Sequence, residues 1–183
     1  MKNIHRHLLC FLLLLFLTAT AYGEDYLTTH IVEISPGIGY YNFDDGRNLD
    51  SSAMEAVGLG LHLSRRWAVI FQFSSFDTIK NVNGFSQTVD MQKYHVDVHR
   101  FFNTEKHLRP YLVLGYGEMD LVSESEKSNE NMFNGGVGLH YRITPSWSIR
   151  TDVRIFTNQK SNYNDNALTL TLAYRFSGGE RGD

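Results

Sequence analysis

Apolar side chains alternate with polar or small ones along almost the whole chain, and the alternation is clearest near the C-terminus. There Leu168, Leu170 and Leu172 alternate with Thr169 and Thr171. Successive side chains of a β-strand point to opposite faces, so this pattern predicts a strand with one apolar face. Helical periodicity is nearly absent after the first 21 residues. The sequence therefore predicts an all-β fold.

The same pattern predicts eight strands, each of about ten residues or slightly more, the length that a tilted strand needs to cross a bilayer. They are expected at residues 31–43, 53–63, 67–76, 90–102, 109–119, 132–143, 147–156 and 167–176.

The connections between these strands alternate in length. Short turns are expected at 64–66, 103–108 and 144–146, and longer polar loops at 44–52, 77–89, 120–131 and 157–166. Short turns on one side and long loops on the other are typical of outer membrane barrels, whose termini lie in the periplasm. The predicted fold class is an eight-stranded antiparallel transmembrane β-barrel of the outer-membrane type.

The N-terminus has the pattern of an export signal. Lys2 and Arg6 precede the apolar run 8–17, and small residues follow at 18–21. The run is too short to cross roughly 30 Å of hydrocarbon as a helix, so a cleavable signal peptide over residues 1–21 is expected. The barrel domain is then expected at 22–176, followed by a periplasmic tail at 177–183.

Composition excludes several classes of protein. Hydrophobic residues make up 42% of the chain and charged residues 20%, which fits neither a disordered chain nor a polytopic helical membrane protein. The formal net charge of −3 does not suggest a nucleic-acid partner. The single cysteine lies inside the predicted signal, so no disulfide is expected in the mature protein.

The face opposite the apolar one decides which side of the barrel meets lipid, because it carries many charged and imidazole side chains. These residues are Glu33, Lys93, His95, Asp97, His99, Arg150, Asp152 and Arg154. Burying so many groups in the ligand cavity of a soluble barrel costs several kcal/mol per unpaired ion, whereas the polar interior of a membrane barrel can pair or hydrate them. We expect them to form a lumenal charge network that either packs the interior or gates a pore.

Small residues share that polar face. Four Gly-x-Gly pairs are found at 37/39, 58/60, 115/117 and 136/138. An eight-stranded barrel is only just wide enough for side chains, so glycines are expected to make room for long charged ones.

The segment 57–67 is similar to 137–147, 80 residues further on. Both contain a strand, a three-residue turn and a tryptophan that begins the next strand. We predict equivalent hairpins, with Trp67 and Trp147 at the periplasmic membrane interface, where amphipathic rings are favoured.

Residues 110–117, 135–153 and 170–176 resemble the transmembrane domain of the OmpA and OprF group of outer membrane proteins. The resemblance implies an eight-stranded barrel with a polar core, inserted by the barrel-assembly machinery. Tyr174 and Phe176 resemble the C-terminal assembly signal of such proteins, although seven residues follow here. Members of the group often continue into a peptidoglycan-binding domain, which we do not expect in this chain.

Two functions are considered first. A barrel of eight strands encloses a packed interior, which favours a structural role or a narrow, low-conductance pore for small solutes or ions. The alternative is a surface-binding adhesin or receptor that acts through its loops. We expect a monomer in the outer membrane, with lipid and lipopolysaccharide as its surroundings.

A lipid-modifying enzyme is less favoured. The outward polar residues Ser75, Gln92 and Glu118 have no outward histidine obviously beside them, and such an enzyme needs a nucleophile, a base and an acid together. His95, Asp97 and His99 share a strand face as metal ligands can, but a lumenal hydrogen-bond network is favoured. No catalytic, cofactor-binding or metal-binding residue is therefore expected.

Overall fold

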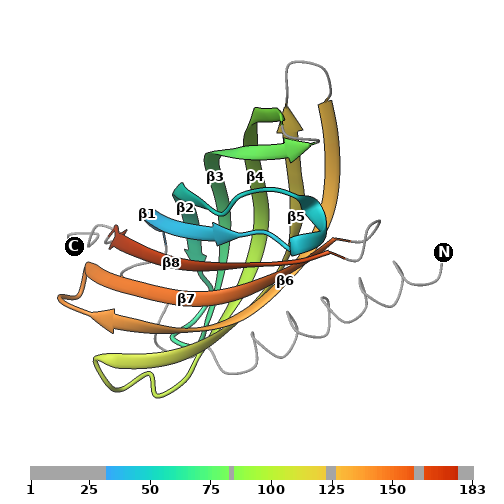
Figure 1. Ribbon diagram of the computed structural model, residues 1–183. Coiled ribbons are helices and arrows are strands. Elements are labelled where there is room, and N and C mark those ends of the chain that lie inside the picture. Colours follow the sequence, from blue (N-terminus) through green and yellow to red (C-terminus); the bar gives the residue numbers. More distant parts are fainter. Residues whose placement is uncertain (1–31, 83–84, 123–126, 159–162, 177–183) are drawn as a thin grey trace, which may run out of the picture.

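The computed structural model describes residues 32–82, 85–122, 127–158 and 163–176, which form one closed barrel of eight antiparallel strands (Figure 1). The strands are β1 (Val32–Asn42), β2 (Ser52–His62), β3 (Trp67–Val82), β4 (Phe85–Phe101), β5 (Leu108–Val122), β6 (Lys127–Arg142), β7 (Trp147–Asn158) and β8 (Asn164–Arg175). Each strand pairs with its neighbours in sequence, and β1 closes the barrel on β8. The predicted fold class is confirmed. The predicted signal peptide and tail lie outside the described residues.

The two ends of the barrel differ. One end, which we call the short-turn end, carries the turns at 63–66, 102–107 and 143–146, and both Val32 and Phe176 lie there. The other end carries a 3-10 turn, η1 (Asp45–Arg47), between β1 and β2, and we call it the η1 end. The described residues include no helix that is long and apolar enough to span a bilayer.

Two of the predicted long loops are wrong. Residues 77–89 were expected to be a loop, but β3 runs to Val82 and β4 begins at Phe85. Likewise β5 and β6 fill most of residues 120–131, and Figure 1 shows these hairpins reaching beyond the ends of β1 and β8. The cross-strand pairing continues there without apolar alternation, because backbone hydrogen bonds do not require it. Apolar alternation therefore detects only the part of a strand that has one apolar face, and it missed the ends of β3 to β6.

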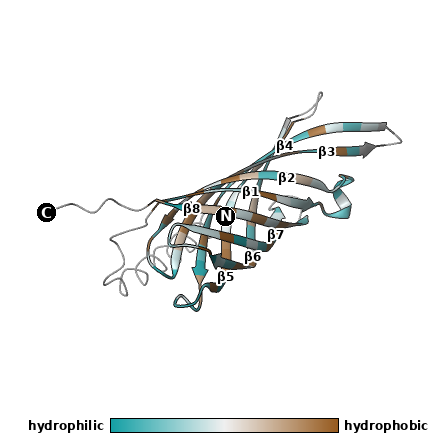
Figure 2. Cartoon of the chain, turned by 90° about the vertical axis from the view of Figure 1, so that its left-hand side faces the viewer, coloured by the Kyte–Doolittle hydropathy of each residue, from teal (hydrophilic) through white to brown (hydrophobic). Residues whose placement is uncertain are grey.

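Large apolar side chains point outward along all eight strands. The most exposed are Ile38 at 63%, Leu114 at 62% and Val137 at 59%. Each is flanked along its strand by residues that face the interior, so hydropathy alternates along the ribbons in Figure 2. This arrangement confirms the expected assignment of the apolar face to the outside of the barrel.

The two segments that are similar in sequence, 57–67 and 137–147, also have similar structures. In the turn between β2 and β3, Ser64 N–H donates to Trp67 O at 3.2 Å, and Trp67 N–H donates to Ser64 Oγ at 3.1 Å. In the turn between β6 and β7, Thr144 and Trp147 make the same two hydrogen bonds, at 3.1 and 2.9 Å. The prediction of equivalent hairpins is confirmed, and both tryptophans lie at the short-turn end.

Candidate functional site in the barrel lumen

All eight residues predicted for the lumen lie inside it. They come from β1, β4 and β7, and each is buried: Glu33, Lys93, His95, Asp97, His99, Arg150, Asp152 and Arg154. They stand at alternate positions of each strand, and the apolar residues between them face outward, because successive side chains of a strand point to opposite faces. The structure groups them into layers along the barrel axis.

The middle layer is centred on Asp97 of β4. Asn134 of β6 donates to Asp97 Oδ1 at 3.0 Å, and His95 Nδ1 lies 2.8 Å from the same oxygen. Arg154 of β7 donates to Asp97 Oδ2. The same arginine donates from Nε to Asp152 Oδ1 at 2.6 Å. Three strands are therefore tied together through one buried carboxylate.

Tyr111 of β5 completes this layer. Its hydroxyl donates to Asp152 Oδ2 at 2.6 Å. Its ring stacks on His99, with centroids 5.0 Å apart and an interplanar angle of 14°. His99 thus packs against an aromatic ring, and its Nε2 lies 3.9 Å from Asp97 Oδ2.

A second layer, nearer the short-turn end, is centred on Glu33 of β1. Arg150 donates to Glu33 Oε1, and His62 Nε2 lies 2.8 Å from Glu33 Oε2. Arg175 of β8 lies 3.9 Å from the same oxygen, and its Nη2 lies 3.3 Å from His140 Nε2. The sequence reasoning missed the contributions of His62, His140 and Arg175. Their strand parity could have identified them, because each alternates with outward apolar residues.

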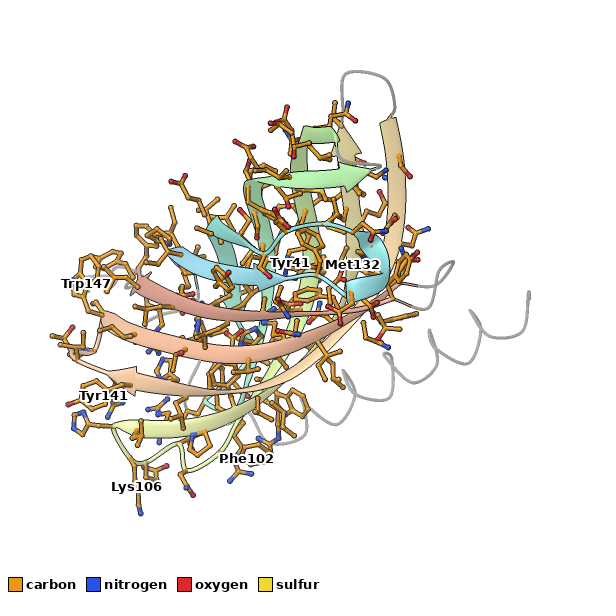
Figure 3. All side chains as sticks on the ribbon, viewed as in Figure 1. Tyr41, Phe102, Lys106, Met132, Tyr141 and Trp147 are labelled. Carbon is orange, nitrogen blue, oxygen red and sulfur yellow. The ribbon has the colours of Figure 1, made fainter. Side chains whose placement is uncertain are left out.

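The η1 end of the lumen is apolar, which corrects the expectation of a polar core throughout. Ten side chains form a buried cluster there: Tyr41, Phe43, Met54, Phe76, Val89, Met91, Met119, Met132, Phe156 and Ala167. Figure 3 shows Tyr41 and Met132 inside the barrel. Sequence alternation could not distinguish this cluster, because its residues are hydrophobic on the same parity as the charged ones.

Lys93 joins the apolar cluster to the charged layers. Its ammonium nitrogen lies 4.3 Å from the ring centre of Tyr41 and 3.9 Å from that of Phe156. A cation this close to two aromatic faces is stabilised by their quadrupoles. The side chain therefore fills the barrel axis between the methionines and Asp97.

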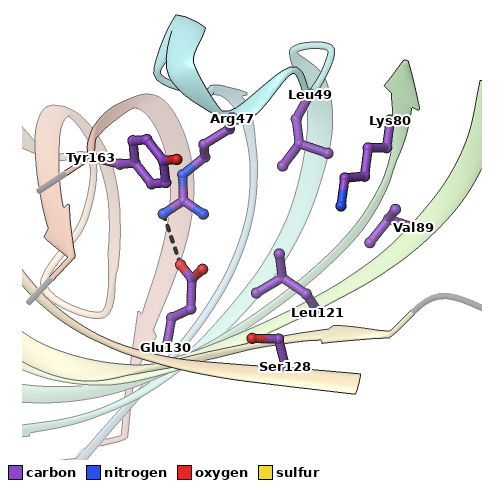
Figure 4. Close-up of a pocket in the computed structure, with 8 residues that line it drawn as sticks. All are labelled: Arg47, Leu49, Lys80, Val89, Leu121, Ser128, Glu130 and Tyr163. Atoms are coloured by element: carbon purple, nitrogen blue, oxygen red, sulfur yellow. Dashed lines mark ion pairs between the residues drawn. The ribbon is translucent and has the colours of Figure 1, made fainter. Parts of the chain in front are cut away.

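Arg47 of η1 covers the mouth above this cluster. Its guanidinium lies 2.8 Å from Glu130 Oε2 and 3.0 Å from Asp165 Oδ1, and it lies over the ring of Tyr163 (Figure 4). Burial opposes the charge of Arg47, but the two carboxylates outweigh it and raise its pKa. The backbone N–H groups of Asn164 and Gly46 hydrogen-bond to Asp44 and lower the pKa of that carboxyl.

A cavity of about 220 Å³ lies beside Arg47 at the mouth. It is lined by Arg47, Leu49, Lys80, Val89, Leu121, Ser128, Glu130 and Tyr163 (Figure 4). At the short-turn end, the space among His62, Phe101, Arg109 and His140 is only about 10 Å³, which is room for a single water molecule at most.

Across the described ranges, no group of three or more His, Cys, Asp or Glu side chains is arranged to hold a metal ion. Ser75 and Gln92 face each other across β3 and β4 on the outer wall, and Glu118 lies opposite Tyr94. The aromatic residues of the predicted assembly signal lie beside Trp147, whose ring centre is 4.7 Å from that of Tyr174. Phe176 continues this cluster, 5.0 Å from Tyr174.

Residues 9–176 of the sequence match the family model of the outer membrane protein beta-barrel domain, in agreement with the closed eight-stranded barrel of the described residues. The chain belongs to this family. It is therefore an outer membrane protein that crosses the bilayer with its strands. No curated protein matches the chain in sequence.

Solved structures of outer membrane barrels share the fold. Neisserial surface protein A is 12% identical, with a TM-score of 0.63, covering 79% of this chain and 97% of that one. The attachment invasion locus protein Ail of Yersinia pestis is 19% identical, with a TM-score of 0.57, covering 80% and 99%. The N-terminal barrel of OprF from Pseudomonas aeruginosa is 13% identical, with a TM-score of 0.54, covering 80% and 100%.

Proposed function

We propose that this protein is a sealed structural barrel of the outer membrane that conducts no solutes, with its short-turn end in the periplasm. The observation that carries the proposal is the filled lumen. Two layers of ion pairs and one apolar cluster follow one another along its axis. We assign it no catalytic role.

The apolar cluster is the strongest barrier to ions. Met91 and Met119 are fully buried, and Met54 and Met132 are 2% exposed. An ion that passed this layer would lose its hydration without gaining oxygen ligands, which is strongly unfavourable. The charged layers below it supply no path either, since Asp97 and Glu33 are already paired with arginines.

Single-channel recording tests the sealed lumen. We expect no steady current from correctly inserted protein in a planar bilayer, because filled eight-stranded barrels leave no aqueous channel. A sixteen-stranded porin in the same bilayer serves as the positive control. A steady small conductance whose ion selectivity changes in Arg150→Ala would instead establish a pore with a charged constriction.

Recognition at the η1 end is a second candidate function, favoured by the extended hairpins and their charge. Among the described residues of 44–51, 77–90, 118–130 and 157–165, eight acidic side chains are exposed or half-buried, and one basic side chain, Lys80, is half-buried. The acidic ones are Asp44, Asp45, Asp50, Asp77, Asp90, Glu118, Asp120 and Glu130. Such a surface attracts cationic partners. Ail, in contrast, has been crystallised with a heparin analogue.

Binding to charged polymers tests this candidate. In vesicles that contain the protein, we expect a lysine-rich peptide to bind at low salt and heparin not to bind. The substitutions Glu118→Gln and Asp120→Asn should weaken the peptide about two- to tenfold, while Arg65→Gln at the opposite end should not. Heparin binding, or peptide binding that neither acidic substitution weakens, would eliminate recognition of cationic partners as a function.

We also propose that Tyr174 and Phe176 act as the signal for the barrel-assembly machinery, and that the protein is a monomer. Phe176 lies at the seam of the barrel, where its N–H donates to Val32 O at 2.9 Å. A signal at this seam would be accessible until β1 pairs with β8, which supports its use during closure.

A further inference from the structure

Two arginines lie close together along the chain pairing at the short-turn end, Arg100 near the end of β4 and Arg66 in the turn before β3. Arg100 of β4 points outward, because Asp97, His99 and Phe101 occupy the inward parity of that strand. Arg66 is exposed in the turn before β3, and its carbonyl accepts a hydrogen bond from Phe101 N–H at 2.8 Å. Among the described residues, neither guanidinium has a carboxylate partner, whereas Arg150 and Arg154 in the lumen are paired with Glu33 and Asp97.

Aromatic rings hold Arg100 in place. Its Cζ lies 4.9 Å from the ring centre of Trp67, its cross-strand partner, and 5.4 Å from that of Phe102. Figure 3 shows Phe102 at the short-turn end, on the outside of the barrel. One N–H of Arg100, at Nη1, donates to Phe101 O at 3.2 Å. Because a guanidinium has five N–H donors, several stay available along its edges.

Arg66 and Arg100 carry like charges, which repel each other. An anion bound between them would relieve this repulsion. The guanidinium fork matches the oxygens of a phosphate group, and tryptophan favours the depth of the lipid headgroups. The chemistry that satisfies all three conditions is the phosphate diester of an anionic phospholipid.

We propose that Arg66 and Arg100, together with Trp67 and Phe102, bind the headgroup of an anionic phospholipid. The assignment of this lipid to the periplasmic leaflet rests on the proposed orientation, but the site itself does not. Its acyl chains would lie along the outward apolar residues of β4 and β5, such as Val96 and Leu114, which are exposed.

The chain contains its own control. Trp147 begins β7 as Trp67 begins β3, after a turn with the same hydrogen bonds. The turn before Trp147 has the sequence Thr144-Pro145-Ser146, where the turn before Trp67 has Ser64-Arg65-Arg66. The cross-strand partner of Trp147 is Tyr174, whereas that of Trp67 is Arg100. The second turn therefore offers the same aromatic position without the arginine pair.

Quenching of tryptophan fluorescence by brominated lipids measures the preference for anionic lipid beside each tryptophan, because the chain has only two tryptophans. The full mature chain is folded into symmetric vesicles as Trp147→Phe, which reports on Trp67, or as Trp67→Phe, which reports on Trp147. Quenching by brominated phosphatidylglycerol is compared with quenching by brominated phosphatidylcholine. We expect Trp67 to prefer the anionic lipid about fivefold or more, and Trp147 to show no preference.

Adding Arg66→Gln and Arg100→Gln to the Trp147→Phe protein should remove the preference, and migration on unheated gels verifies that the barrel is folded. An equal preference at both tryptophans, or one that survives the two substitutions, would overturn the proposal. Inorganic phosphate at millimolar concentration should leave the preference unchanged. If phosphate abolishes it, the site takes a free anion and the lipid assignment is wrong.

Discussion

Asp97→Ala is expected to lower the free energy of unfolding by about 3–5 kcal/mol, the usual effect of removing one partner from a buried ion pair. The substitution leaves Arg154 buried with Asp152 as its remaining carboxylate, and it takes the acceptor from His95 and Asn134. Urea unfolding of the barrel in detergent micelles, followed by tryptophan fluorescence, measures the change.

The exposed pair between Arg65 and Glu105 is the matched control. Its atoms are 3.5 Å apart, and the side chains are 49% and 81% exposed. Glu105→Ala should therefore change the free energy of unfolding by about 1 kcal/mol or less. A loss below about 1 kcal/mol for Asp97→Ala as well would show that the middle layer does not stabilise the barrel, and the structural role of the network would have no support.

Gly136→Ala is expected to destabilise the barrel by about 3 kcal/mol or more, at or above the usual cost of overpacking a core. A Cβ at this position would lie 2.3 Å from Val153 O and 2.9 Å from Arg154 Cγ. Val153 O is a backbone atom, so β7 itself would have to shift to relieve the clash. The shift would also displace Arg154 from Asp97. Urea midpoints and the fraction of compact protein on unheated gels measure the effect.

Gly135, the preceding residue, provides a control on the same strand. Its added Cβ would point outward, and the nearest atom would be Leu114 Cδ2 at 3.3 Å, the end of a flexible side chain. We expect Gly135→Ala to fold with a urea midpoint close to that of the parent protein. Equal effects of the two substitutions would mean that crowding in the lumen is not why β6 carries Gly136.

Strand count and the two faces of the barrel could be predicted from sequence, because lipid contact imposes a period of two wherever a strand crosses hydrocarbon. Leu168 to Tyr174 and Lys93 to His99 show this pattern on opposite faces, and both sets lie where it indicates. The lengths of β3 to β6 could not be predicted, since strand pairs beyond the membrane have no such contrast between faces.

Which lumenal residues meet was decided only by the tertiary structure. Glu33 and Arg150 are 117 residues apart, and Asp97 and Arg154 are 57 apart, so their pairing depends on strand register and on the closure of β1 against β8. The pairing of Trp67 with Arg100 depends on register in the same way. The sequence by itself determined which side chains face inward, because alternation is a local property of each strand. Only the closed barrel decided that Lys93 contacts Tyr41 and Phe156, because β1, β4 and β7 converge on one axis when the barrel closes.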